Sequence, residues 1–69
     1  MYYVLWFERK LEKQGNDNKR NHCRYLSVAR TTAYNISLRD GVSDVAVVDK
    51  SGNVKFNYDQ QGNETKGNS

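Results

Sequence analysis

The sequence has little cysteine and histidine, with one residue of each, Cys23 and His22. A single thiol cannot form an intramolecular disulfide, and these two residues do not make a cluster with the spacing of a zinc site. We therefore expect no metal and no cofactor. Because a lone cysteine is typical of proteins in a reducing compartment, the expected location is the cytoplasm.

Apolar residues are also scarce, at 36% of the 69 residues, although aromatic residues reach 12%. A chain of this length forms one domain, close to the lower size limit for a fold held by a single hydrophobic core. The most apolar stretch is YYVLWF at residues 2–7. It is shorter than the about 20 residues of a transmembrane helix, and no basic region of an export signal precedes it. The sequence thus predicts a small protein without a membrane partner that is not exported.

Catalytic motifs are missing as well. Adjacent residues of a strand point to opposite faces, so His22 and Cys23 cannot form a nucleophile–base pair. Asp44 and Asp49 bracket a predicted strand and fail as a general acid–base pair for the same reason. No glycine-rich loop has the pattern that binds phosphate. We predict that the protein is not an enzyme and has no small-molecule substrate.

The basic residues that are present concentrate in the first part of the chain. Residues 1–40 carry a net charge of +4, and residues 41–69 carry a net charge of −1. One window holds most of this positive charge and only two acids, Glu12 and Asp17. It is the candidate surface for contacts with nucleic-acid phosphates, and its basic residues are Arg9, Lys10, Lys13, Lys19, Arg20 and Arg24.

The alternation of β-forming and turn-forming residues predicts a single domain over residues 1–58. The polar residues 12–22 are predicted to form a mobile loop within it, because they contain no apolar side chain. Residues 59–69 also lack apolar side chains and are predicted to be a disordered polar tail. The predicted strands cover residues 2–10, 22–26, 44–49 and 54–58, the last two as a β-hairpin.

Residues 28–40 fit two structures. As a helix, the segment has an N-cap at Ser27 and a terminating glycine at Gly41. As a strand, residues 31–38 alternate in polarity and contain β-branched threonines. The helix is favoured because cap, terminator and one apolar face agree on its boundaries, the face being Ala29, Ala33 and Ile36.

Together these elements predict a small α+β domain of the order ββαββ, with three or four mainly antiparallel strands and one helix on one face. The alternative is a five-stranded all-β meander or barrel in which residues 31–38 form a strand. In the α+β fold a single helix can cover only one face of the sheet. Because the strands at residues 2–10 and 44–49 are apolar on both faces, we expect the second face to meet a partner.

Alternation of side chains divides the first strand into two sets. One set is predicted to lie under the helix and comprises Tyr3, Leu5 and Phe7. The other set is predicted to form the partner-binding face and comprises Tyr2, Val4, Trp6, Ala46 and Val48.

Three occupants of that face are considered: a second copy of the chain, a different protein, and the stacked bases of a single-stranded nucleic acid. A homodimer or another protein partner is favoured, because self-association adds the core that so short a chain lacks. The protein is then a non-catalytic interaction module or regulator, like adaptors and small inhibitors encoded by phages or mobile elements. Nucleic-acid binding is the alternative, since aromatic and basic residues occur together.

Overall fold

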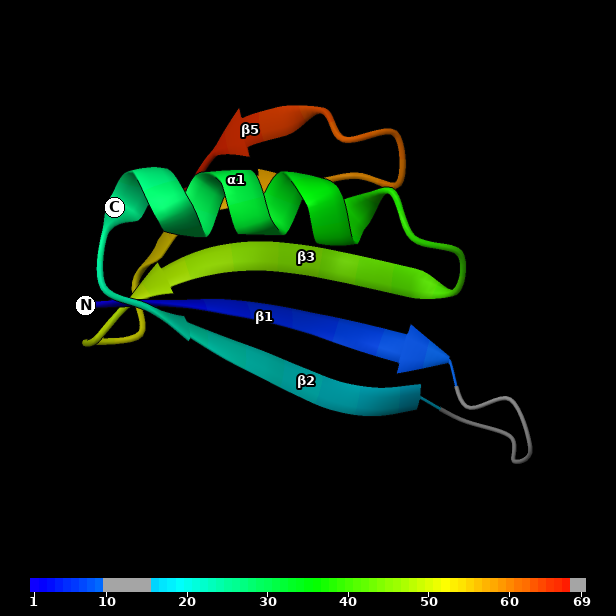
Figure 1. The fold of residues 1–69 in the computed structure, drawn as a ribbon, viewed down its shortest axis with the longest axis horizontal. Coiled ribbons are helices and arrows are strands. Elements are labelled where there is room, and N and C mark those ends of the chain that lie inside the picture. The colour runs from blue at the N-terminus through cyan, green and yellow to red at the C-terminus, as the bar shows by residue number, and fades with distance from the viewer. Residues whose placement is uncertain (10–15, 68–69) are drawn as a thin grey trace.

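The computed structural model describes residues 1–9 and 16–67 and shows one helix and five strands in those ranges (Figure 1). All five strands belong to one sheet of the order β2-β1-β3-β4-β5, in which every neighbouring pair is antiparallel. The sheet is open, and α1 packs against β3 and β1 on one side of it. The elements are β1 Tyr2–Arg9, β2 Asn16–Cys23, α1 Leu26–Ser37, β3 Val42–Asp49, β4 Val54–Tyr58 and β5 Glu64–Lys66. The predicted α+β class with one helix is confirmed, and the closed all-β barrel is wrong. The predicted number of three or four strands is also wrong, because residues 64–66 add a fifth strand by pairing with β4.

Helix α1 forms where small apolar residues recur at helical spacing. Ala29, Ala33 and Ile36 are buried, as predicted, and the small alanine side chains let the helix lie close to the sheet. The predicted N-cap is wrong, because Ser27 is the second residue of the helix. The N-cap position belongs to Tyr25, whose side chain makes no capping hydrogen bond. The packing of the apolar face, and not the cap, therefore stabilises this helix.

The hydrophobic core fills the space between α1 and the sheet. Val4 of β1 lies opposite Val47 of β3, and both are fully buried. Burial of such a valine contributes roughly 1.5–3 kcal/mol, so a few of these side chains supply much of the stability of a chain this short. The other buried members of this cluster are Cys23, Ala29, Ala33, Ile36, Val42, Val45 and Tyr58.

Two residues with left-handed backbone conformation shape the beginning of β3. Gly41, the predicted helix terminator, has a φ of 80° and lies beyond the C-cap Leu38, and its carbonyl accepts the backbone N–H of Arg9 at 2.8 Å. Asp44 has a φ of 55° and lies where the β1–β3 register shifts, opposite Trp6. The shift is a β-bulge, which places one extra residue on β3 and decides which of its side chains face α1.

The two turns that join β3, β4 and β5 repeat one pattern, Asp-x-x-Gly-Asn, at residues 49–53 and 59–63. In each turn the aspartate carboxylate accepts the backbone N–H groups two and four residues later, at 2.8–3.0 Å. The glycines have φ values of 87° and 83°, which a residue without a side chain adopts at low cost. Mainly because of the N–H of the turn asparagine, the pKa values of Asp49 and Asp59 lie below their usual range.

The structure corrects two predictions about polar segments. Residues 16–22 of the predicted mobile loop belong to β2, which pairs with β1 from one end to the other, whereas residues 12–15 lie outside the described residues. Up to residue 67, the predicted disordered tail consists of the second turn and β5, which pairs with β4. Polar side chains did not exclude these strands, because their backbone hydrogen bonds come from the adjacent strand.

Candidate functional site

The helix covers the face of β1 that was predicted to bind a partner. Val4 is fully buried in the core, and Tyr2 and Trp6 pack against the same core. Val4 is therefore not available as a binding surface, and this part of the prediction is wrong. Tyr2 and Trp6 keep partly exposed side chains, and Trp6 also lines a groove together with Leu5 and Ala46. The prediction that these residues and their neighbours on β1 point to opposite faces was correct. Alternation does not say, however, which of two apolar faces a helix will cover.

The strand register also separates the predicted partner-binding residues. Ala46 pairs with Leu5, and Val48 pairs with Tyr3, so both lie on the face of the sheet opposite to Val4. Val48 is 7% exposed although it does not belong to the core cluster beneath α1. Ala46 and Val48 are thus placed on the uncovered face, as predicted, but with a different set of β1 residues.

The face of the sheet away from α1, here called the open face, is formed by alternate residues of three strands. β1 contributes Phe7, which is 38% exposed, together with Tyr3 and Leu5, which are partly buried. No described helix or strand covers this face. Its residues are Tyr3, Leu5 and Phe7 of β1, Asn18, Arg20 and His22 of β2, and Ala46 and Val48 of β3.

A groove of about 550 Å³ runs across the open face. Its floor is apolar and includes Leu5, Ala46 and Val54. Its two sides carry opposite charges, with Lys19 and Arg20 on β2 and Asp44 on β3. The groove thus combines an apolar floor with charged side chains of both signs at its edges.

One end of the open face carries a stacked group. The rings of Tyr3 and His22 are parallel within 17°, and their centres are 5.0 Å apart. The guanidinium carbon of Arg20 lies 5.5 Å from the centre of the Tyr3 ring, which is the distance of a cation–π contact. These contacts hold the three side chains close together on the open face.

The structure places the residues of the basic window on different surfaces. Arg20 lies on the open face and Lys19 lines its groove, but Arg24 follows the end of β2 and is exposed outside it. Arg9 lines a different cavity, beside Gly41 at the end of β1. The remaining two, Lys10 and Lys13, lie outside the described residues. Of the four that the structure describes, two are brought together at the groove.

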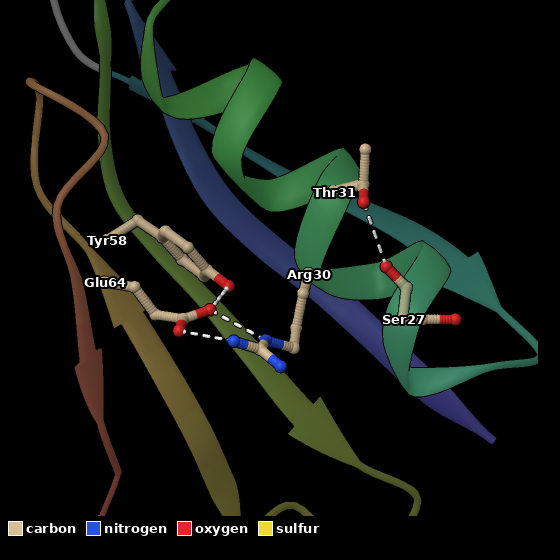
Figure 2. A network of polar contacts seen from close by, with 5 residues as sticks. All are labelled: Ser27, Arg30, Thr31, Tyr58 and Glu64. Carbon is tan, nitrogen blue, oxygen red and sulfur yellow. Dashed lines mark hydrogen bonds and ion pairs between the residues drawn. The ribbon is translucent and has the colours of Figure 1, made fainter.

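A separate polar cluster attaches β5 to α1 (Figure 2). Arg30 of the helix donates two hydrogen bonds to the carboxylate of Glu64, at 2.9 Å from Nε and 2.7 Å from Nη2. The hydroxyl of Tyr58 donates to the same carboxylate. The Arg30 hydrogen bonds hold the pKa of Glu64 below its usual range, and burial is the main reason why the pKa of Tyr58 is raised. These contacts hold β5 against α1 and therefore stabilise the fold.

The residues weighed for catalysis lie apart from one another. Cys23 is buried in the core, while the adjacent His22 points to the open face and stacks on Tyr3. Over residues 1–9 and 16–67, no group of three or more histidine, cysteine, aspartate or glutamate side chains is arranged to hold a metal ion. No helix in those ranges is long and apolar enough to cross a membrane.

Sequence reasoning missed Tyr3, Leu5 and Phe7 as residues of the exposed face. The signal that would have found them is Cys23, because a free cysteine is among the residue types most often buried. In a hairpin of β1 and β2, Cys23 lies directly opposite Tyr2, so the face that buries the thiol is the face of Tyr2 and Val4.

Comparison of the chain with protein-family models, with curated proteins and with solved structures finds no match in any of the three. The fold and the site therefore define the class: a small single-domain α+β protein with an open five-stranded antiparallel sheet over the described residues.

Proposed function

We propose that this protein is a non-catalytic interaction module or regulator that binds another protein surface through its open face, in a reducing, cytoplasmic setting. The observation that carries the proposal is the exposed apolar groove on the side of the sheet that α1 leaves free. A contiguous apolar surface on a small domain costs solubility unless a partner covers it, so such surfaces mark interaction sites. The buried state of Cys23 suits a thiol that packs rather than reacts.

The composition of the open face supports a protein partner. Leu5 and Phe7 are anchors of the apolar kind that fill pockets on a partner, and they lie between charged residues that set orientation. Aromatic anchors such as Tyr3 add contact area at low conformational entropy cost, because the stack with His22 already orders the ring.

The test is site-specific photocrosslinking in cells. A benzophenone amino acid replaces Phe7 on the open face or, as the matched control, Tyr25, which is 62% exposed and precedes α1. The proposal expects a discrete protein adduct from position 7 and none from position 25. Leu5→Asp in the same chain should abolish the adduct. Equal labelling from both positions, or none from position 7, would overturn the proposal.

Single-stranded nucleic acid is the second candidate, and the contacts around Tyr3 favour it. An aromatic ring beside Arg20 and His22 resembles the combination of stacking and phosphate-binding groups in single-strand binders. The same crosslinking experiment separates the two, because nuclease treatment would remove a nucleic-acid adduct at position 7. Affinity for single strands would also fall steeply with salt concentration.

A further inference from the structure

We propose that the protein which occupies the open face is a second copy of this chain, packed sheet against sheet about a two-fold axis parallel to β1. The inference rests on the proposed function of the open face and adds the identity of the partner. The charges of the groove and the position of its apolar residues each support it.

The charges of the groove are complementary to themselves. Arg20 lines it from β2, on one side of β1, and Asp44 lines it from β3, on the other side. Rotation by 180° about an axis along β1 turns the open faces toward each other and exchanges the two sides. Each copy then presents Arg20 to Asp44 of its partner, and the pair forms twice because a two-fold interface is isologous.

These two side chains are available for such a pair. Among the described residues Asp44 forms no ion pair, and the described contact of Arg20 is its cation–π contact with Tyr3. In register, Arg20 lies opposite Leu5, and Asp44 lies at the bulge between the partners of Leu5 and Phe7. The offset along the strands is thus one to two residues, or about 3–7 Å, which an arginine side chain spans.

The apolar residues lie where this axis needs them. Leu5 and Phe7 belong to β1 itself, so each meets its own copy at or near the axis. Ala46 is small and adjacent to Leu5, which leaves room for the partner's leucine. Packed sheets are about 10 Å apart, a distance that side chains of this size fill.

The test is the association constant from sedimentation equilibrium of three charge variants and one apolar variant. Arg20→Asp places like charges together twice, and so does Asp44→Arg; each alone should weaken dimerisation by about tenfold or more. An equimolar mixture of the two variants restores both attractive pairs and should dimerise as a heterodimer, close to the wild-type affinity. Arg24→Asp is the matched control, because it makes the same charge change outside the groove and should leave association unchanged.

Leu5→Asp should abolish dimers while retaining the circular dichroism of the fold. A monomeric wild-type chain at high micromolar concentration would overturn the second-copy inference, and so would a mixture no better than its components. If such a chain still gave a crosslink from Phe7 to a different protein, the proposed function would stand without this inference. A monomer without any crosslink would overturn both, and a strongly salt-sensitive single-strand complex would assign the face to nucleic acid instead.

Discussion

Val4→Ala and Leu5→Ala test the assignment of the two faces of β1 most directly, because the residues are adjacent in sequence. Val4 is fully buried between α1 and the sheet, while Leu5 is partly exposed on the open face. Both substitutions remove only aliphatic carbon and leave the β1 backbone hydrogen bonds in place. A difference between them therefore reports which side the helix covers.

The expected magnitudes follow from burial. Val4→Ala removes two methyl groups, worth about 0.8 kcal/mol each, and leaves a cavity in a core that cannot fully collapse, for a total of roughly 2–3 kcal/mol. In a domain of this size that loss lowers the melting temperature by about 10–20 °C. Leu5→Ala in the monomer should cost less, about 1–2 kcal/mol, because the side chain is partly exposed and its truncation opens onto the groove instead of leaving an enclosed cavity.

Urea and thermal unfolding followed by circular dichroism measure both values. The measurements belong at the lowest workable protein concentration, so that association through the open face does not add to the apparent stability. A loss for Leu5→Ala equal to or larger than that for Val4→Ala would refute the reasoning, because it would place the core on the other side of the sheet.

Three further predictions concern the C-terminal hairpin. Tyr58→Phe removes the hydroxyl that donates to Glu64 and should lower the free energy of unfolding by about 1 kcal/mol, with faster amide exchange in β5. The lowered pKa values of Glu64 and of the two turn aspartates stabilise the fold above the pKa of the unfolded carboxyls, near 4. The melting temperature should thus be level from about pH 5 to 8 and fall below about pH 4. Arg30→Met should weaken that fall, because it removes the partner that lowers the pKa of Glu64. A pH profile unchanged by Arg30→Met would contradict a stabilising role of the Arg30–Glu64 pair. Gly62→Ala should destabilise the protein more than Gly52→Ala. Both glycines have a positive φ, but a Cβ at Gly62 would lie 2.7 Å from a ring carbon of Tyr34, whereas one at Gly52 would meet nothing within 4 Å. Equal melting temperatures of the two variants would count against the contact with Tyr34.

Several elements were predictable because their signals are local. The apolar face of α1 follows from the spacing of Ala29, Ala33 and Ile36, and the β3–β4 hairpin follows from β-formers around a turn with a glycine. The strands at residues 16–23 and 64–66 were not predictable in this way. Their side chains are polar, and the hydrogen bonds that hold them come from neighbouring strands. The repeat of Asp-x-x-Gly-Asn was a readable signal for the last of them.

The two faces of β1 show which features local sequence signals cannot predict. Alternation alone established that β1 has two apolar faces and that one helix leaves one of them uncovered. It could not rank the set of Tyr3 and Leu5 against the set of Val4 and Trp6, because both are large and apolar. Shifting the pairing of a strand by one residue moves every side chain to the opposite face of the sheet, which would exchange the two sets. On β3 such a shift is produced by one extra residue at the bulge, where Asp44 lies.

By itself, the sequence determined an α+β domain with one amphipathic helix and a sheet that is apolar on both sides, of which a single helix covers only one. Only the tertiary structure decided that Val4 is core and Leu5 is surface, and that Arg20 and Asp44 flank one groove. The physical reason is that side-chain periodicity is a property of each strand, whereas the choice of the covered face depends on register between strands and on where the helix packs.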